Sequence, residues 1–468
     1  MSYSGLPGGH AAVVAVIGGG ASGTLAASYL LRSAAAAQVP LRIALIDRHG
    51  RHGLGQAYST QHPVHLLNSR ADRMSVLAHD PGHLVRWAAD RGIAHDGFLP
   101  RPAYGQYLRD VLAEAERAAR PTATLTPVTS DVTGLTADRP GGRLRLHLRV
   151  GGMVDADLAI LATGNQPPAL PCPVPATPRL INDPWAPGAL DRVADGCPVL
   201  IIGTGLTMLD VAVTVTRAHP AAVVHAVSRH ALLPREHRCP PGGTAWRLAL
   251  PAGRVGLRYL IRHVRVAAAQ AGDEWPSVID GLRPCIPALW QQLTPEDKRL
   301  FLRYLARYWE VHRHRVPPAT ARRIRQLREA GRLSVRPGRL LEVAGDQSGL
   351  SARIEHDGRL AEIRAGWVIN ATGPSADITS TTDPLLSGLL GRGLVRPDPL
   401  RLGIEADARG AVLDSSGQPS EVLFTLGPPL RGQLYETTAI PEIRDQAAAL
   451  AARLVEAARA RYTRGSAA

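Results

Sequence analysis

Two apolar runs of this chain each end in a glycine-rich turn. Residues 13–17 (VVAVI) precede the turn at residues 18–23 (GGGASG), and residues 199–202 (VLII) precede the turn at residues 203–208 (GTGLTM). Each pattern predicts a buried strand, a tight turn and the start of a helix. Because such a unit binds the pyrophosphate of a dinucleotide, the pair predicts two dinucleotide sites in one chain.

The first turn has the features of an FAD site. Gly18 permits the tight turn, Gly20 lets the backbone approach the phosphates, and Gly23 lets the following helix press against its strand. An apolar strand then ends in Asp47, 24 residues after Gly23. A carboxylate at this position accepts a hydrogen bond from a ribose hydroxyl. The alternative is a glycine-rich turn with a purely structural role.

The second turn differs from the first in two ways. Met208 occupies the place of a third small residue, which should loosen the packing of the helix but leave access to phosphate. The next strand, residues 222–227, ends in Ser228 and Arg229 rather than in an acid. Because arginine binds phosphate through two parallel hydrogen bonds, these residues suit the 2′-phosphate of NADPH. The alternative is that Arg229 is a solvated loop cation.

Two further apolar strands end in the same tripeptide, Ala-Thr-Gly, at residues 162–164 and 371–373. They mark where the chain crosses between dinucleotide domains. The predicted fold class is therefore α/β, with two Rossmann-like domains, the NADPH domain inserted into the FAD domain, and an added helical block. The predicted ranges are a flexible tail at 1–10, the FAD domain at 11–190 and 366–468, and the NADPH domain at 191–365 with a helical insertion at 234–332.

The helical block and the last part of the chain contain the candidate substrate contacts. Apolar spacing predicts helices at about 253–272, 275–292, 295–314 and 318–331, and a last helix at about 441–460 with Thr438 as its cap. The positive end of this last helix is expected to face the pyrimidine edge of a flavin. Arg235, His237 and Tyr435 are candidate catalytic residues, with a structural role as the alternative. His312 and His314 are expected on a solvated helix face rather than at a metal.

Composition excludes several classes of function. The net charge is +14, but almost all of the positive charge is arginine, Lys298 is the one lysine, and aromatic residues are only 4%. This predicts a basic, solvated surface rather than a nucleic-acid interface. The four cysteines are widely separated, which argues against a dithiol centre and against a metal site. Neither a secretory signal nor a membrane span is apparent, so a cytoplasmic protein is expected, possibly a homo-oligomer.

The chain also resembles the FAD/NAD(P)-binding proteins related to the bacterial YdhS protein. The resemblance covers nearly the whole chain, although the helical block matches least. Its motifs are Ser22-Gly23-Thr24, Gly55-Gln56-Ala57-Tyr58, His65-Leu66-Leu67-Asn68 with Met74-Ser75, Leu99-Pro100-Arg101 with Tyr104 to Leu108, and Leu426-Gly427-Pro428 with Arg431-Gly432. This group is similar in plan to the flavin-containing and N-hydroxylating monooxygenases.

Together the motifs and the resemblance imply a function. We expect an FAD-dependent, NADPH-using monooxygenase that hydroxylates a small polar metabolite with molecular oxygen through a flavin hydroperoxide. Two alternatives stay open: a flavin dehydrogenase or reductase that passes electrons to a quinone or other carrier, and a non-catalytic FAD-binding scaffold or sensor. The expected cofactor-binding residues are Gly18, Gly20, Ala21, Ser22, Gly23, Asp47, Arg48, His65, Asn68, Met74, Ser75, Thr163, Gly164, Gly203, Gly205, Leu206, Thr207, Ser228, Arg229, Gly373, Gly427, Pro428 and Thr438.

Overall fold

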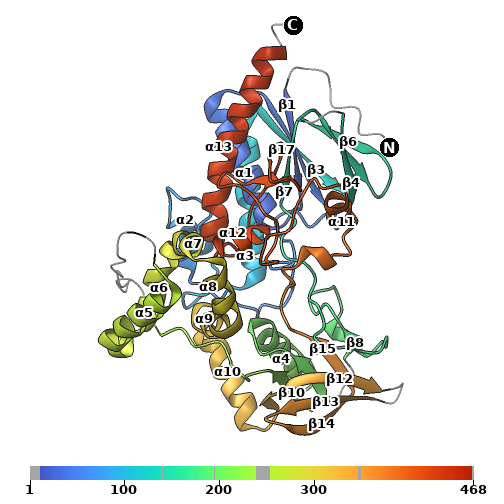
Figure 1. Cartoon of the computed structure of the whole chain (residues 1–468), viewed down its shortest axis with the longest axis vertical. Helices are drawn as coiled ribbons and strands as arrows, with labels where there is room; N and C mark the ends of the chain where they lie inside the picture. Colours follow the sequence, from blue (N-terminus) through green and yellow to red (C-terminus); the bar gives the residue numbers. More distant parts are fainter. Residues whose placement is uncertain are drawn as a thin grey trace.

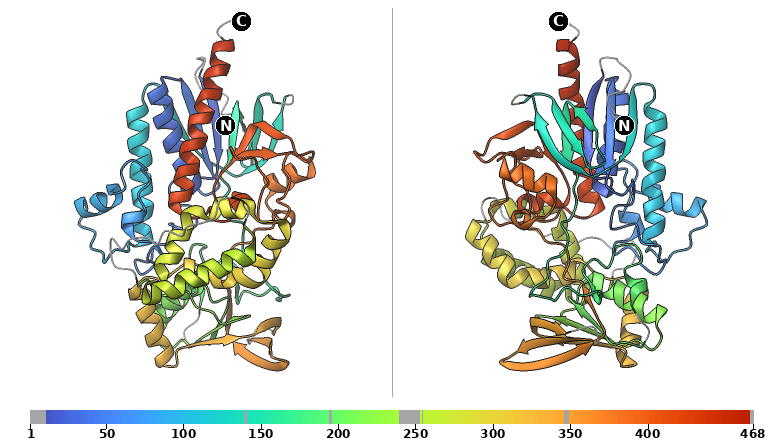
Figure 2. Two further views of the ribbon diagram at one scale, coloured as in Figure 1. Left: turned by 60° about the vertical axis from the view of Figure 1, so that its left-hand side comes forward. Right: turned by 90° about the vertical axis from the view of Figure 1, so that its right-hand side faces the viewer.

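The computed structural model describes residues 11–138, 141–193, 196–238, 253, 255–345 and 349–465, the last four without their side chains. The predicted tail at 1–10 lies outside the described residues, as does Trp246 of the predicted helical block. The molecule has two lobes, each built on a sheet, and a helical block beside their junction (Figures 1 and 2).

The first lobe is built on a six-stranded sheet. Its strands, in spatial order, are β16 (Ala411–Leu413), β17 (Pro419–Thr425), β7 (Leu158–Leu161), β1 (Ala12–Ile17), β2 (Leu41–Asp47) and β3 (Ala123–Thr129). All neighbours are parallel except β16 and β17. Every residue of β1 and β7 is buried, which is expected of central strands with both faces covered.

Helices and a small sheet cover the two faces of this first sheet. On one face, α1 (Ala21–Ala37) packs between α3 (Arg101–Ala119) and the long last helix α13 (Ile440–Gly465). On the other side lies an antiparallel sheet of β4 (Val132–Ala137), β5 (Leu144–Leu148) and β6 (Met153–Ala156) (Figure 1). Two short helices, α2 (His83–Asp90) and α11 (Pro384–Gly391), complete the lobe.

The second lobe is built on a five-stranded parallel sheet. Its strands, in spatial order, are β11 (Leu333–Pro337), β10 (Val224–Ser228), β9 (Val199–Ile202), β15 (Trp367–Asn370) and β8 (Leu180–Ile181). It carries α4 (Leu206–Ala218), α10 (Pro318–Glu329) and an antiparallel sheet of β12 (Arg339–Gly345), β13 (Leu350–His356) and β14 (Arg359–Ala365). Met208, which replaces a small residue, is fully buried in the core of this lobe. The predicted fold class, with two parallel sheets and one domain inserted into the other, is confirmed.

Both predicted domain boundaries need correction. Strand β15 hydrogen-bonds to β9 and β8, so the second sheet extends through Asn370 and also includes Leu180 and Ile181. The boundary predicted at 190/191 therefore lies about ten residues after the start of the second sheet. The boundary predicted at 365/366 lies before its strand β15. The first boundary is late because the short strand β8 already pairs with β15, and the second is early because the crossing at 371–373 follows the last strand of the domain that the chain is leaving.

The helical block is more broken than predicted. Its helices are α5 (Leu257–Ala271), α6 (Pro276–Leu282), α7 (Ile286–Gln292), α8 (Pro295–Leu300) and α9 (Ala306–Arg313), with a π-helical turn at Phe301–Leu305. The helix predicted at 275–292 breaks at Arg283–Cys285 because Pro284 has no amide hydrogen to donate. The block packs on α12 (Arg431–Leu434), where the indole of Trp290 donates to the Gly432 carbonyl over 2.7 Å.

Candidate cofactor and substrate site

Each glycine turn lies against one Ala-Thr-Gly crossing. Gly18 and Gly203 both have positive φ angles, +110° and +113°, which favour glycine. A Cβ atom on Gly18 would lie 2.2 Å from the carbonyl oxygen of Ala162, and one on Gly203 would lie 2.2 Å from that of Ala371. The two dinucleotide units therefore repeat one construction, in which the turn after one strand contacts the backbone at the end of its neighbour.

The first turn is covered by the loop at residues 50–58. The amide of Gly53 donates to the Gly19 carbonyl over 2.9 Å. A Cβ atom on Gly20 would lie 3.5 Å from the Cα of Gly55. A Cβ atom on Gly23 would lie 1.8 Å from the Gly18 carbonyl oxygen, which explains why the helix can pack so close to its strand. This loop would enclose a phosphate group bound at the turn.

Asp47 holds the first turn and its loop together. One carboxylate oxygen accepts from the amide of Gly19 over 3.2 Å, and the other accepts from the amides of His49 and Arg51 over 2.9 and 3.0 Å. A carboxylate has about four acceptor positions, so the residue retains capacity for a ribose hydroxyl. The predicted role of Asp47 in FAD binding is compatible with these contacts.

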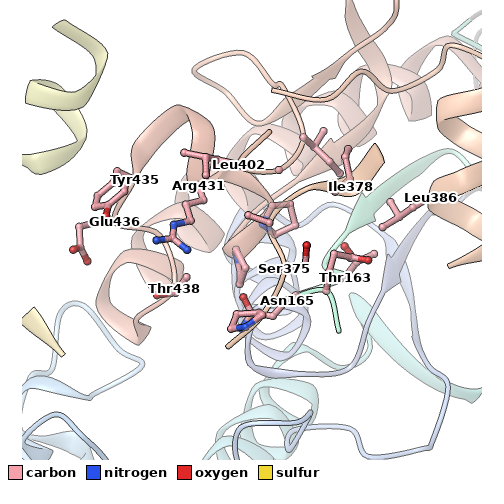
Figure 3. A pocket seen from close by; sticks show the side chains of 18 of the residues that line it. Thr163, Asn165, Ser375, Ile378, Leu386, Leu402, Arg431, Tyr435, Glu436 and Thr438 are labelled. Atoms are coloured by element: carbon pink, nitrogen blue, oxygen red, sulfur yellow. The ribbon is translucent and has the colours of Figure 1, made fainter. Parts of the chain in front are cut away.

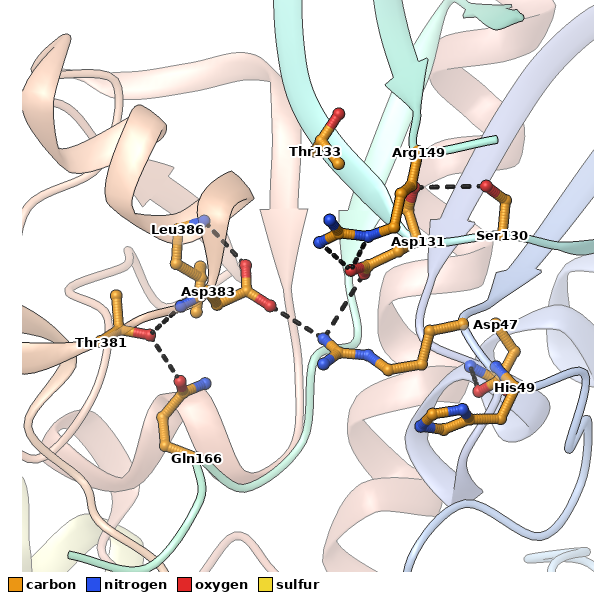
Figure 4. Close-up of polar contacts among 12 residues, drawn as sticks. Asp47, His49, Ser130, Asp131, Thr133, Arg149, Gln166, Thr381, Asp383 and Leu386 are labelled. Carbon is orange, nitrogen blue, oxygen red and sulfur yellow. Dashed lines mark hydrogen bonds and ion pairs between the residues drawn. The ribbon is translucent and has the colours of Figure 1, made fainter. Parts of the chain in front are cut away.

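Arg48, which was predicted to bind cofactor, is held by other protein groups. Its guanidinium lies 2.8 Å from Asp383, at the N-cap of α11, and 3.6 Å from Asp131 (Figure 4). Asp131 is shared with Arg149 over 2.8 Å. The structure therefore gives Arg48 a role in joining α11 to the sheet of the first lobe.

The second turn is open where the first is covered. A Cβ atom on Gly205 would have no neighbour within 4 Å, and the same holds for Gly164 and Gly373 in the two crossings. The hydroxyl of Ser228 lies 2.8 Å from that of Thr204 and accepts from the amide of Ala231 over 3.1 Å. Ser228 is thus engaged in shaping the loop, whereas Arg229 is exposed.

A cavity of about 340 Å³ lies where the two lobes and the helical block meet (Figure 3). The first lobe and the crossings line it with Thr163, Gly164, Asn165, Gln166, Pro374, Ser375, Ala376, Ile378, Leu386, Leu402, Gly403, Ile404, Pro428, Pro429, Arg431, Tyr435, Glu436 and Thr438; the second lobe contributes Leu206, and the helical block Glu310 and His314. Pockets for small molecules have volumes of roughly 300–1,000 Å³.

One buried polar atom at this cavity has no protein partner. The hydroxyl of Thr163 is inaccessible and makes no hydrogen bond within the described part of the chain. Buried polar groups are nearly always hydrogen-bonded, so an orphaned hydroxyl at a cavity wall suits a bound polar ligand. Gly427 closes the same region from the C-terminal side, since a Cβ atom there would lie 2.4 Å from the Ser22 hydroxyl at the start of α1. The residues of the first lobe at this cavity therefore fit a polar cofactor such as FAD.

Four polar side chains form one wall of the cavity. Arg431 and the Tyr435 hydroxyl donate to one oxygen of Glu310 over 3.0 and 3.1 Å, and His314 Nε2 lies 3.0 Å from the other oxygen. Burial raises the pKa of Glu310, but His314, Arg431 and Tyr435 outweigh it and lower the pKa to about 2. Burial and the Glu310 carboxylate raise the pKa of Tyr435. The wall therefore carries a permanent carboxylate–guanidinium pair.

A second buried pair anchors this wall to the helical block. Glu436 accepts from the Trp309 indole over 2.9 Å and from Arg313 over 3.1 Å. Arg283 then makes two 2.6 Å hydrogen bonds to Glu442 in the first turn of α13. The block is thus fixed to the C-terminal segment of the first lobe through charged side chains, and this contact is what completes the cavity.

Of the three predicted catalytic residues, only Tyr435 lies at the cavity. His237 Nε2 lies 2.9 Å from the Asn68 carbonyl oxygen, its ring packs 4.9 Å from that of Phe98, and burial lowers its pKa to about 4. Arg235 is exposed, and its backbone pairs with Val311 and Val316. The structure places both residues away from this cavity: their backbone groups join the loop after β10 to Val311 and Val316, and the His237 ring contacts the first lobe through Asn68 and Phe98.

The residues that sequence reasoning missed are Glu310 and His314. His314 was expected on a solvated helix face, but α9 ends at Arg313 and His314 turns toward the cavity. The one local signal was the four-residue spacing of Glu310 and His314, which places both on one helix face. Their partners on α12 are more than 100 residues away in the sequence, so spacing could not identify them.

Four residues predicted from the resemblance have protein contacts instead. His65 lies 2.7 Å from the hydroxyls of Thr60 and Thr214, and burial lowers its pKa to about 4. The Asn68 carbonyl bonds to His237, and the Met74 carbonyl accepts from the Tyr104 hydroxyl. The Ser75 hydroxyl donates to the Asp80 carbonyl over 2.7 Å. The structure uses these side chains and carbonyls to pack the lobes and the loop before α2. These contacts do not test the predicted role of the four residues in cofactor binding, which stays a prediction.

The two turns, the two crossings and the shared cavity define the fold of proteins that bind both FAD and NAD(P). In agreement, residues 15–166 match a family model described as FAD-NAD(P)-binding. The chain is also similar to the Escherichia coli (strain K12) protein YdhS, with 27% identity over 220 residues. That match spans 44% of this chain and 40% of the E. coli protein, which is less than half of the relative's length.

Two solved structures show the same fold over nearly the whole chain. The ornithine N-hydroxylase KtzI of Kutzneria sp. 744, with reduced FAD, NADP+ and L-ornithine, has a TM-score of 0.62 at 16% identity, covering 96% of this chain and 99% of its own. The L-lysine 6-monooxygenase of Pseudomonas syringae has a TM-score of 0.63 at 15% identity, covering 97% and 100%. The resemblance in plan to N-hydroxylating monooxygenases is confirmed at the level of the fold.

Within the described part of the chain, no helix combines the length and the apolar character needed to cross a membrane. The described residues also contain no group of three or more His, Cys, Asp or Glu side chains that could hold a metal ion.

Proposed function

We propose that this protein is an FAD-dependent, NADPH-using monooxygenase that acts on a small polar molecule with molecular oxygen. The observation that carries the proposal is the cavity at the junction of both lobes and the helical block. It brings Thr163 of the first crossing, Leu206 at the start of α4 and the polar wall around Glu310 to one space. A flavin, a nicotinamide and a substrate must meet in such a space, because each reacts with the next.

The first lobe would hold FAD with the glycine turn, Asp47, Thr163 and the segment at Gly427 and Pro428. When bound, FAD supplies the redox chemistry, accepting electrons from NADPH and passing them to oxygen. The protein's part is to place the ring against Thr163 and the residues around Thr438, and to keep water away from it. The covered first turn supports a cofactor that stays bound.

The polar wall would bind and orient the substrate. Arg431 uses one nitrogen for Glu310, so its other donors face the cavity. Tyr435 is held by Glu310, and its ring packs 4.7 Å from that of Trp290, which fixes its position. His314 is held through Nε2, which leaves Nδ1 as the nitrogen that would hydrogen-bond to a substrate or water. These groups suit a small molecule with both donors and acceptors.

Electron transfer through a cysteine pair is not favoured by the site. Cys172, Cys197 and Cys285 are free, and none of them is among the described residues that line the cavity. A reductase that passes electrons to a quinone, and a non-catalytic scaffold, are therefore the alternatives that the experiment must distinguish.

The test uses purified, FAD-loaded protein and begins with the flavin spectrum. NADPH added without oxygen should bleach the bound flavin, and a scaffold would leave it oxidised. Small amines, amino acids and heterocycles are then screened with NADPH and isotopically labelled O2. A substrate should speed NADPH oxidation and gain one labelled oxygen atom, as detected by mass spectrometry. If quinones accelerate NADPH oxidation and no tested compound gains label, the monooxygenase proposal is wrong and the reductase is supported.

A further inference from the structure

We propose that the helical block supplies part of the NADPH site, with Arg307 joining Arg229 and His230 to bind the 2′-phosphate. This inference rests on the proposed function, because it concerns the same nucleotide. It goes further in placing a specificity-determining residue outside the Rossmann-like domain, on α9. The chemistry recognised is a phosphate monoester on the ribose of an adenine nucleotide.

The loop that follows β10 is attached at one end to the second glycine turn. The hydroxyl of Thr204, in that turn, lies 2.8 Å from Ser228 and donates to the Leu232 carbonyl over 2.7 Å. Arg229 and His230 lie between these two fixed points. The end of the second strand of a dinucleotide-binding domain is where the ribose lies, whereas the pyrophosphate lies at the glycine turn. Arg229 and His230 are therefore placed for the ribose phosphate.

The other end of the same loop is attached to α9. The amide of Arg235 donates to the Val311 carbonyl over 2.9 Å, and the amide of Val316 donates to the Arg235 carbonyl over 2.8 Å. Arg307 precedes Val311 by four residues, about one helical turn, on α9. The backbone contacts thus bring the side of α9 that contains Arg307 next to the loop.

Arg307 is oriented but not neutralised by its neighbours. One terminal nitrogen donates to the Arg303 carbonyl over 3.1 Å, and the guanidinium lies 4.9 Å from the centre of the Tyr308 ring. Its Nε is buried and has no hydrogen-bond partner in the described part of the chain. A buried donor without a partner is costly, so a ligand that accepts from it would bind favourably.

Arg307 and Arg229 are two cations that act on the same imidazole, that of His230. Burial lowers the pKa of His230, and so do Arg307 and Arg229, in keeping with the backbone bonds that bring the loop next to α9. Within the described residues, none of the three forms an ion pair with a carboxylate. Two nearby arginines without counterions repel one another, and an anion bound between them would remove this repulsion. A ribose phosphate supplies that charge and accepts hydrogen bonds from both guanidinium groups.

The test measures nucleotide binding to the FAD-loaded holoprotein by calorimetry, with adenosine 2′,5′-bisphosphate and AMP as probes. The variants are Arg307→Gln and Arg303→Gln, which is the matched control because Arg303 is an exposed arginine one turn earlier on the same helical segment. The wild type and Arg303→Gln should bind the bisphosphate more tightly than AMP. Arg307→Gln should lose about tenfold or more in bisphosphate affinity and little in AMP affinity.

Further measurements keep the outcomes distinct. Flavin content and melting temperature show whether Arg307→Gln is folded, and Arg307→Lys, which retains the charge but not the fork of donors, should recover part of the affinity. Equal losses in Arg307→Gln and Arg303→Gln, or an equal loss for both probes, would overturn the inference. If the wild type binds the bisphosphate and AMP alike, the phosphate site is wrong although a flavoenzyme using NADH still stands. If NADP+ and NAD+ both fail to bind, the proposed function fails as well.

Discussion

The two glycine turns share one construction but differ in what surrounds them. Both press against the carbonyl of an Ala-Thr-Gly crossing at the same 2.2 Å Cβ distance. The first is covered by the loop that contains Gly53 and Gly55, whereas the space beside Gly205 is empty to 4 Å. A covered turn retains its ligand and an open turn lets its ligand exchange. The difference therefore matches a resident FAD and a nicotinamide nucleotide that enters and leaves in each cycle.

The largest expected effect comes from adding one methyl group to each turn. Gly23→Ala places a Cβ atom 1.8 Å from the Gly18 carbonyl, which must displace α1 from its strand. We expect a loss of stability of about 3 kcal/mol or more and a failure to retain FAD. Gly205→Ala has open space for the methyl group, so stability and flavin content should be preserved while NADP+ binding weakens.

Urea denaturation and flavin absorbance measure the first variant, and calorimetry with NADP+ measures the second. If Gly205→Ala loses FAD, or if Gly23→Ala retains FAD at wild-type stability, the assignment of covered and open turns to the two cofactors is wrong.

The turns and their strands could be predicted from the sequence because their information is local. The strand predicted to end in Asp47 does end there, since an apolar run and a terminal acid lie side by side in the chain. The polar wall of the cavity could not be predicted in this way. Glu310 and His314 belong to the helical block, while Arg431 and Tyr435 are more than 100 residues further along. They come together because the helical block packs on the C-terminal segment through α7 and α12, which brings Glu310 within hydrogen-bond distance of Arg431 and Tyr435.

The interface between the two lobes gives the second-largest effect, and it depends on pH. His65 of the first lobe is buried and neutral, with Thr214 of the second lobe as a partner. Its pKa is about 4 in the folded protein and about 6.5 when unfolded, so the unfolded chain binds more protons between these values. The contribution to stability is complete above about pH 6.5 and falls by about 3 kcal/mol by pH 4.

Urea denaturation of wild type and His65→Gln at several pH values tests this. The variant should lose less stability on acidification than the wild type, because it lacks the titrating ring. His79→Gln, at an exposed position, is the control and should keep the wild-type slope. If the unfolding free energy of His65→Gln depends on pH as steeply as that of the wild type, the histidine between the two lobes does not make their contact depend on pH.

A smaller effect on stability is expected where the helical block joins the first lobe. Glu310→Gln removes the charge that Arg431 and His314 share. Because the folded pKa is about 2 and the ordinary value is 4.5, the carboxylate stabilises the fold above about pH 4.5, and this is lost as the pH falls toward 2. About a third of the side chain remains accessible, so we expect a loss of about 2 kcal/mol at neutral pH, after screening by solvent.

The measurement is the difference in unfolding free energy between wild type and Glu310→Gln, which should shrink as the pH is lowered. Glu296→Gln is the control in the same block, since Glu296 is exposed and lies 3.6 Å from Arg299. It should change stability by less than about 0.5 kcal/mol. A constant Glu310→Gln difference across the acid range would contradict the charged pair.

The smallest predicted effect separates the two Ala-Thr-Gly crossings themselves. The hydroxyl of Thr163 is buried without a partner, whereas that of Thr372 lies 2.7 Å from Asn370 Oδ1 and 3.1 Å from the Ala169 carbonyl. Thr372→Val should therefore cost about 1 kcal/mol of stability in the apoprotein and leave FAD binding unchanged. Thr163→Val should leave the apoprotein equally stable or slightly more so, and weaken FAD binding about fivefold. Urea denaturation and flavin fluorescence titration read the two quantities separately. Equal effects of both substitutions on stability would mean that Thr163 has a protein partner, and the two crossings would then be alike.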